Sequence, residues 1–300
     1  MARSEVTPVM TQLDTLQATT PQKKKLHPRV KALLRPGFLL GFFILSSSIL
    51  LAVFPWAFAP YDPNAFDFNA IQKSPSWAHP FGTDNLGRDT LSRVIWAYQV
   101  DMQIAFFATF FAMVIGVVVG SLVAYHGGIA DVLFGRLVDV TITFPFLVLV
   151  IAVVAVLGPG LTNMYVAVTL VQWVYYARLT RAEIMTQMTS DYASAGRVMG
   201  YSSGRIIFRH LLPNAMTPLI TYWMTDMALA ILLGSSLGYL GLGAQPPQAE
   251  WGVLIAEGRN FITTAWWMSL MPGVAIVLTG LGFSLVGDSL ADVLRPRGAS

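Results

Sequence analysis

Apolar runs of about twenty residues recur along this chain and constrain its fold more than any other feature. A run of that length is what an α-helix needs to cross the hydrocarbon layer of a membrane. Backbone groups in lipid must be hydrogen-bonded within their own segment, so such runs predict helices. Six of them can be assigned, at about residues 37–58, 102–125, 132–157, 163–179, 215–239 and 266–286. We therefore expect an all-α polytopic membrane protein with six transmembrane helices.

The overall composition agrees with this class and excludes several others. Charged residues make up 12% of the chain and hydrophobic residues 55%, whereas soluble domains carry about 25% charge. The chain has no cysteine, which excludes disulfides, thiolate catalysis and cysteine metal sites. Its few basic residues flank the apolar runs, so the net charge of +3 does not indicate nucleic-acid binding.

Lysine and arginine are divided unequally between the two sides that six spans would create. Fifteen of the 19 lie in the two tails, in the loop after the second span or in the central loop after the fourth. Those on the opposite side are Lys73, Arg88, Arg93 and Arg259. By the positive-inside rule, both termini and the central loop face the cytoplasm.

The central loop between the fourth and fifth spans has the pattern of two short helices joined by a turn. Asp191 is placed to accept hydrogen bonds from the first turn of a helix over Tyr192–Met199. Gly200 is placed to end that helix in a left-handed turn, which a residue without Cβ adopts readily. The first half of the loop is therefore predicted to be a capped helix.

A second, basic helix is expected after this turn. Ser202 or Ser203 can cap its start, and Pro213 is expected to end it before the next span. Arg205 and Arg209 are one turn apart, on a different face from the neighbouring apolar residues. A cytoplasmic helix–turn–helix with outward arginines suits docking to a soluble partner. An ordinary loop with two surface helices is the alternative.

The spacing within this loop resembles the EAA loop of ABC importer permeases. The chain keeps four residues of that pattern: Ala195, Gly200, Leu212 and Pro213. It departs at three, where it has Ser194, Gly196 and His210. The resemblance implies that the first helix binds a groove on an ATPase. The residues assigned to this coupling role are Asp191, Tyr192, Ala193, Ser194, Ala195, Gly196, Arg197, Gly200, Arg205, Arg209, Leu212 and Pro213.

The polar stretch after the first span carries a second signature, His79-Pro-Phe-Gly-Thr-Asp-Asn-Leu-Gly-Arg-Asp-Thr-Leu-Ser-Arg93. Its two glycines predict turns, and Asp89 can start an interfacial helix that leads into the second span. Asp89 and Arg93 are four residues apart and can pair on that helix. A lone histidine is more often structural than a metal ligand, so no metal site is assigned at His79.

This stretch closely resembles the C-type subunit of the dipeptide/oligopeptide permease family, and the resemblance continues through the rest of the chain. Further matching segments are Gly127-Gly128, Tyr176-Ala177-Arg178, Leu240-Gly241-Leu242-Gly243, Trp266-Trp267 and Gly287-Asp288. Such a subunit belongs to a type I ABC importer and has the MetI-like permease fold. The implied partners are a homologous permease subunit, two ABC ATPase subunits, a periplasmic solute-binding protein and membrane lipid.

The resemblance also implies a domain plan for a bacterial inner-membrane protein. The expected parts are a cytoplasmic tail at 1–36, a first transmembrane helix at 37–58, a periplasmic segment with an interfacial helix at 59–100, a five-helix permease core at 101–290 with a cytoplasmic coupling loop at 180–213, and a cytoplasmic tail at 291–300. The first span is expected to pack outside the core.

No catalytic pattern is found in the sequence. None of the five lysines follows a glycine, so the chain has no P-loop for ATP. The His-Glu-x-x-His metalloprotease pattern is absent as well. We therefore expect a non-catalytic subunit without cofactor or metal, for which the partner ATPases hydrolyse ATP.

Acidic residues in the spans are candidates for the transport pathway because a carboxylate in lipid is costly. Asp226 is the deepest, about half-way along the fifth span. It is expected either to line the pathway and meet a substrate amino group or to pair with a polar group on a neighbouring helix. Pro145 is expected to kink the third span.

The cargo stays open at this point. Subunits that resemble this chain serve di- and oligopeptides, but also nickel or metal chelates, opines, glutathione and D-amino-acid dipeptides. A secondary transporter is a more distant alternative, which would be expected to show repeated halves with broken helices. No convincing internal repeat is present. The leading interpretation is the permease subunit of an ATP-driven peptide importer.

Overall fold

The structure is a computed structural model that describes residues 35–294, and every long element in that range is a helix. The all-α prediction is confirmed. The expected tail at 1–36 lies almost entirely outside the described residues, whereas the first four residues of the tail expected at 291–300 belong to α14. In chain order the helices are α3 (Pro36–Val53), α4 (Pro55–Phe58), the 3₁₀ turn η2 (Phe68–Ala70), α5 (Thr90–Gln103), the π turn η3 (Ile104–Ala108), α6 (Thr109–His126), α7 (Gly128–Thr143), α8 (Phe146–Leu157), α9 (Leu161–Met188), α10 (Asp191–Val198), α11 (Ser203–Arg205), the π turn η4 (Ile206–Leu211), α12 (Leu212–Tyr239), α13 (Trp251–Gly258), the 3₁₀ turn η5 (Arg259–Phe261) and α14 (Trp267–Leu294).

Among the described residues, four helices are long and apolar enough to cross a membrane. They are α3, the continuous helix Thr90–His126, the continuous helix Ser203–Tyr239 and α14. A fifth span results if α7 and α8 are counted together. Helix α9 holds the predicted fourth span, but its second half is polar and carries Arg178, Arg181 and Glu183. The structure thus supports four to five spans by length and composition.

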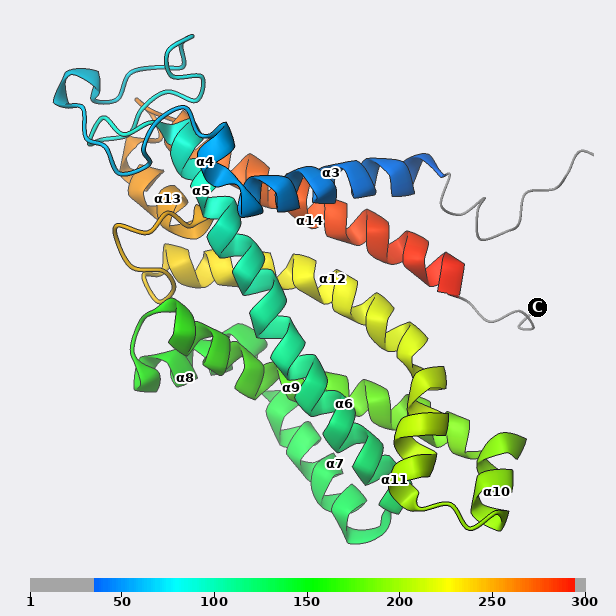
Figure 1. Ribbon diagram of the computed structural model, residues 1–300. Coiled ribbons are helices and arrows are strands. Elements are labelled where there is room, and N and C mark those ends of the chain that lie inside the picture. Colours follow the sequence, from blue (N-terminus) through cyan, green and yellow to red (C-terminus); the bar gives the residue numbers. More distant parts are fainter. Residues whose placement is uncertain (1–34, 295–300) are drawn as a thin grey trace, which may run out of the picture.

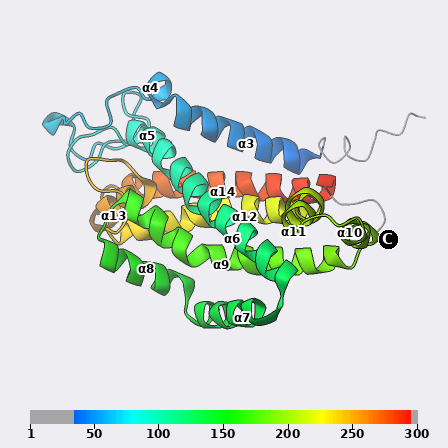
Figure 2. The ribbon, with the colours of Figure 1, turned by 60° about the horizontal axis from the view of Figure 1, so that its bottom comes forward.

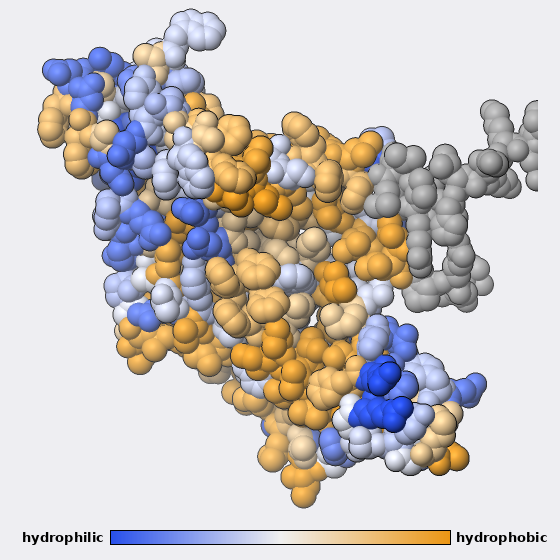
Figure 3. Space-filling view, in the orientation of Figure 1, coloured by the Kyte–Doolittle hydropathy of each residue, from blue (hydrophilic) through white to orange (hydrophobic). Residues whose placement is uncertain are grey.

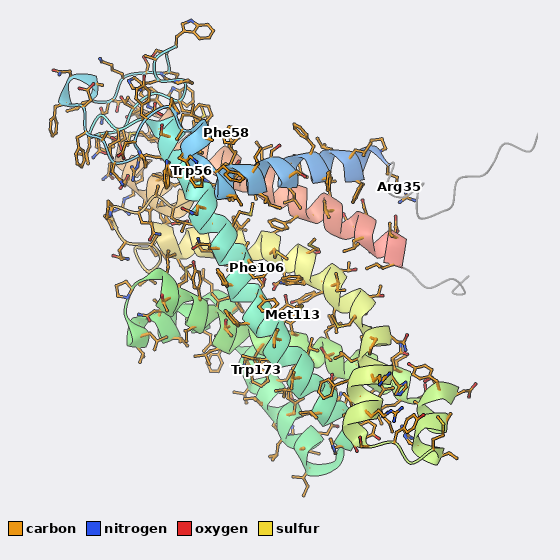
Figure 4. All side chains as sticks on the ribbon, in the orientation of Figure 1. Arg35, Trp56, Phe58, Phe106, Met113 and Trp173 are labelled. Atoms are coloured by element: carbon orange, nitrogen blue, oxygen red, sulfur yellow. The ribbon has the colours of Figure 1, made fainter. Side chains whose placement is uncertain are left out.

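Apolar surface forms a broad band between two hydrophilic ends (Figure 3). The loop after α4 and helix α13 lie at one end, and α10 with α11 lies at the other (Figure 1). Helix α3 packs along α14, and these two lie at the opposite edge of the bundle from α7 (Figures 1 and 2). Where α3 begins and α14 ends, Arg35 forms an exposed ion pair with Asp292. Trp56 and Phe58 lie at the other end of α3 (Figure 4).

The helix expected to begin after Asp89 continues without interruption into the second span. Asp89 accepts a hydrogen bond from the backbone N–H of Ser92 at 2.7 Å, which confirms it as the capping residue. The helix passes through the π turn η3, where the Thr109 hydroxyl donates to the carbonyl of Ala105 at 2.6 Å. Trp223 of α12 donates to the same hydroxyl at 2.8 Å. This turn therefore joins the second span to α12.

The predicted kink at Pro145 is a complete break. Helices α7 and α8 meet there at 93°, and Phe144 has extended backbone angles. A proline excludes the helical conformation from the residue before it, which explains why the break falls at this position. The third predicted span, 132–157, is consequently two short helices.

Glycines on α6 allow a close contact between α6 and α9. A Cβ at Gly116 would lie 2.6 Å from the carbonyl oxygen of Trp173, and one at Gly120 would overlap with the backbone of Ala177. Both facing residues belong to α9. Small residues four apart let two membrane helices approach until their backbones touch, and van der Waals packing then holds them. This contact fixes α9 against α6.

A buried ionic cluster ties the loop before α5 to α13. Arg88 donates to Asp84 at 2.6 Å and to Glu257 of α13 at 3.1 Å. Arg93 donates to Asp84 at 3.0 Å and also contacts Glu257. The predicted pair between Asp89 and Arg93 is wrong. Asp89 is occupied by the helix cap and by His79, and Arg93 points to two other carboxylates.

His79 has a structural role, as expected of a lone histidine. Its Nδ1 lies 2.9 Å from a carboxylate oxygen of Asp89. Within residues 35–294 no group of three His, Cys, Asp or Glu side chains is arranged to hold a metal ion. The contact therefore supports the start of α5.

We predict that Gly120→Leu destabilises the protein by about 1–3 kcal/mol, because the added side chain cannot be accommodated between α6 and α9. Thermal unfolding of the detergent-solubilised protein, followed by tryptophan fluorescence, measures the change. Gly135→Leu is the matched control, since a Cβ at this helical glycine meets nothing within 4 Å. Equal unfolding temperatures for the two variants would contradict the packing role of Gly120.

Removing one carboxylate from the buried cluster should strongly lower the free energy of unfolding. Asp84→Asn leaves Arg88 and Arg93, which are 6% and 2% exposed, sharing only Glu257, and breaking a buried pair costs about 3–5 kcal/mol. Asp292→Asn removes a solvent-exposed pair and should cost less than about 1 kcal/mol. The same unfolding assay compares them. If Asp84→Asn lowers the stability no more than Asp292→Asn does, the buried cluster does not contribute to stability as proposed.

Candidate functional site

The first helix of the central loop begins one residue earlier than expected. Helix α10 covers Asp191–Val198, and Ser190 occupies the N-cap position. Asp191 is therefore not the capping residue but the first helical one. Its charge lies in the first turn, where a negative side chain is favourable for the helix dipole. Ser190 does not cap through its side chain, because its hydroxyl donates to the carbonyl of Gln187 at 2.6 Å.

Gly200 ends α10 as predicted. Its φ is +73°, in the left-handed region that favours glycine. The N–H of Tyr201 donates to the carbonyl of Gly196 at 3.1 Å, and the N–H of Gly200 donates to that of Arg197 at 3.0 Å. These two bonds form a Schellman motif. The turn is therefore fixed by backbone hydrogen bonds.

The second helix of the loop does not end at Pro213. It begins at Ser203, with Ser202 at the N-cap position, and continues through the π turn η4 into α12. In this turn the N–H of Leu212 bonds to the carbonyl of Ile207, five residues back. A widened turn leaves room for a proline that lacks its own N–H, so Pro213 is accommodated. The predicted helix end is wrong for that reason.

An apolar cluster holds the loop against three long helices. Ala193 and Gly196 face inward from α10, and Ile206 from the second helix is 1% exposed. The cluster also contains Ala124 of α6, Ile184 of α9 and residues at the start of α12. The loop is thus a packed part of the bundle, and it cannot move without moving those helices.

The outer face of the loop combines exposed apolar and basic groups. Val198 is 89% exposed and Met199 59%. Arg205 lies over the ring of Tyr201, with its guanidinium carbon 3.8 Å from the ring centroid. The predicted coupling residues on the surface are Asp191, Tyr192, Ser194, Ala195, Arg197, Gly200, Arg205, Arg209 and Pro213. Buried or partly buried ones are Ala193, Gly196 and Leu212.

Asp226 lies in the middle of α12 and is 2% exposed. Tyr176 of α9 donates its hydroxyl to Asp226 Oδ2 at 2.5 Å, and Gln172 of α9 donates its side-chain N–H to Oδ1. The interpretation that Asp226 pairs with a neighbouring helix is therefore confirmed. Sequence analysis missed these partners, although their spacing of four residues places both on one face of α9.

A cavity of about 300 Å³ adjoins this carboxylate. Four polar or aromatic side chains from α9 and α12 contribute to it, together with apolar groups. The lining residues are Phe146, Gln172, Tyr175, Tyr222, Asp226, Leu229, Leu232 and Leu233. A buried acidic group beside a cavity of this size can interact with a small ligand or transported group.

Other acidic residues in or beside the spans have different surroundings. Asp101 is fully buried and accepts the N–H of Trp251 at 3.1 Å, so it helps to fix the start of α13. Glu250 caps the same helix by accepting the N–H groups of Gly252 and Val253 at 2.8 and 3.0 Å. Burial raises the pKa of the Glu250 carboxyl. Asp139 and Asp288 are exposed.

Comparisons with known proteins agree on one family. Residues 116–299 match the model of the binding-protein-dependent transport system inner membrane component. A dipeptide transport system permease protein of Alkalihalophilus pseudofirmus is 38% identical, with 86% of this chain and 85% of that protein covered. A probable D,D-dipeptide transport system permease protein of Escherichia coli is 40% identical, with 85% of each covered. A glutathione transport system permease protein of Pectobacterium atrosepticum is 37% identical, with 86% of this chain and 85% of that protein covered.

The fold also matches a solved structure. A chain of the MetNI methionine ABC transporter in an inward-facing conformation aligns with a TM-score of 0.56, and the match covers 68% of this chain and 98% of that chain. At 21% identity it shows the type I importer permease fold alone. With the family match and the relatives above, this chain belongs to the binding-protein-dependent transport system inner membrane components, as the non-catalytic, multi-pass permease of an ABC system that works with an ATPase and a binding protein.

Proposed function

We propose that this chain forms, with a second homologous permease subunit, the pathway through which an ABC importer takes up di- and oligopeptides. The peptide cargo is supported by the relatives, since the proteins most similar to this chain include dipeptide and D,D-dipeptide permeases. Glutathione is the second candidate, because one relative of nearly the same identity is a glutathione permease. Glutathione is itself a small peptide, so both candidates share the same chemical class.

We further propose that α9 also crosses the membrane, which brings the total to six spans, and that both termini are cytoplasmic. Close packing on α6 supports this arrangement, since the Gly116 and Gly120 contacts place the apolar half of α9 alongside a helix that is long enough to cross. The excess of lysine and arginine at the α10 end supports its cytoplasmic location. The loop before α5 and helix α13 would then face the periplasm, where the solute-binding protein delivers cargo.

The loop from α10 to α12 is proposed to dock an ATPase, with two ATPases serving the permease pair. Its exposed apolar residues Val198 and Met199 support this assignment, because a short helix with an apolar outer face suits a groove on a partner. The surrounding residues Arg197, Arg205 and Arg209 supply positive charge at the rim. Packing of the inner face on α6 and α9 would convert ATPase closure into a rigid-body movement of the spans.

The main support for coupling between the docking loop and the pathway is the continuous helix Ser203–Tyr239. One end of it belongs to the docking loop, and its middle carries Asp226. A displacement of the loop would therefore move the pathway residue directly. We propose that Asp226 lines the pathway, supported by the cavity beside it.

Gly200→Glu should abolish ATPase docking while leaving membrane insertion intact. The substitution forces a side chain into a left-handed conformation and adds negative charge beside the docking helix. Co-purification of the ATPases with the tagged chain measures the loss. Gly127→Glu is the matched control, because Gly127 is also an open glycine with a positive φ of 62°. Undiminished ATPase recovery with Gly200→Glu would exclude this docking role.

Purification of the chain from its native membranes tests the whole assignment. Mass spectrometry should identify a second permease and P-loop ATPases in the same complex. Ligand screening of the co-encoded binding protein would then distinguish dipeptides from glutathione. Isolation of a stable chain without any ATPase would overturn the proposed coupling role, and a binding protein that retains neither ligand would overturn the proposed cargo.

A further inference from the structure

We propose that Asp226, Gln172 and the rings of Tyr175 and Tyr222 form a site for the ammonium group of a peptide in passage. The inference rests on the proposed function, since it assigns a ligand chemistry to the pathway residue. It goes further by naming the acceptors, the aromatic groups and the part of the cargo that they recognise. These residues come from the facing sides of α9 and α12 and border one cavity.

The charge of Asp226 is not balanced by a cation within the described part of the chain. Its two hydrogen-bond donors, the Tyr176 hydroxyl and the Gln172 amide, are both neutral. No Lys, Arg or His of residues 35–294 forms an ion pair with it, although seven such pairs occur elsewhere in that range. A carboxylate in a membrane interior is ordinarily matched by a partner. A cationic ligand would supply that partner.

Gln172 provides a second, independent indication of a missing donor. The side chain is 4% exposed, and its Oε1 atom has no hydrogen-bond partner among the described residues. An unsatisfied buried acceptor is unfavourable. Gln172 also lines the cavity, and a ligand there can donate to this shielded oxygen if the side chain turns toward the cavity. An ammonium group has three N–H donors and can serve Asp226 and Gln172 together.

The remaining lining residues favour a cation over an anion. Tyr175 and Tyr222 border the cavity, and aromatic faces attract an ammonium group. Tyr222 is held edge-on to Tyr176, with ring centroids 5.0 Å apart. Among residues 35–294, none that lines the cavity is basic. An anionic ligand would therefore meet an acidic group and find no positive charge.

The apolar side of the cavity suits the rest of a small peptide. Leu229 and Leu232 are 51% and 55% exposed and lie at its rim, while Leu233 and Phe146 complete the wall. These exposed leucines leave the cavity open to the outside of this chain. The geometry thus points to an amine end held by α9 and α12 and an apolar end directed outward.

Uptake of labelled alanyl-alanine into proteoliposomes that contain the complete transporter and its binding protein tests the site. Asp226→Asn keeps the shape but removes the charge, and loss of a hydrogen bond to a charged group should lower kcat/KM by about ten- to a hundredfold. Gln172→Leu should lower it less. Asp288→Asn, an exposed acidic residue on α14, is the matched control and should leave uptake unchanged.

Photocrosslinking gives a readout that does not depend on turnover. Leu229→p-benzoylphenylalanine places a reactive group at the cavity rim, and the complex should capture labelled alanyl-alanine but not its N-acetylated form. Capture should be lost when Asp226→Asn is added. Gel filtration checks that each variant still assembles.

The outcomes separate this inference from the proposed function. Normal dipeptide uptake by Asp226→Asn, or equal capture of the free and acetylated peptides, would overturn the ammonium site and leave peptide import intact. If the unaltered complex takes up no dipeptide, the proposed function fails. Amine-dependent capture in that case would still support the ammonium site, and loss of that capture as well would overturn both proposals.

Discussion

The rest of the structure depends on one helix that runs without interruption from the central loop into the middle of the apolar band. Ser203–Tyr239 achieves this by a π turn at Ile206–Leu211, which accommodates Pro213 inside the helix. The loop is anchored below by buried side chains of α6 and α9. The loop and Asp226 therefore belong to one helix, in which Pro213 and Pro218 each lack the N–H that would bond within it.

Charged side chains form ion pairs at the two ends of the molecule, whereas the carboxylate in its middle does not. Asp84, Arg88, Arg93 and Glu257 balance each other where the loop before α5 meets α13. At the other end Arg181 pairs with Asp131 between α9 and α7. Asp226 lies mid-band and, like Asp101 near α13, has only neutral donors among the described residues. The ionic clusters thus join neighbouring elements at the two ends, and the proposed ammonium site lies between them.

Local backbone chemistry was predictable wherever one residue type decides the conformation. Gly200 adopts positive φ, Asp89 caps α5, and Pro145 breaks a helix. Predictions failed where several partners compete for one group. Arg93 bonds to Asp84 and Glu257 instead of Asp89, and Glu257 is distant in sequence. The N-cap of α10 is Ser190, one residue before the predicted Asp191.

The sequence alone determined the helical membrane class, the position of the central loop and the family resemblance, because these follow from apolar run length, charge placement and short-range motifs. It also singled out Asp226, since a carboxylate in an apolar run is conspicuous. Only the tertiary structure decided what surrounds that carboxylate. Gln172 and Tyr176 reach it because α9 and α12 cross at this depth, and such a crossing depends on packing between distant residues that no local pattern encodes.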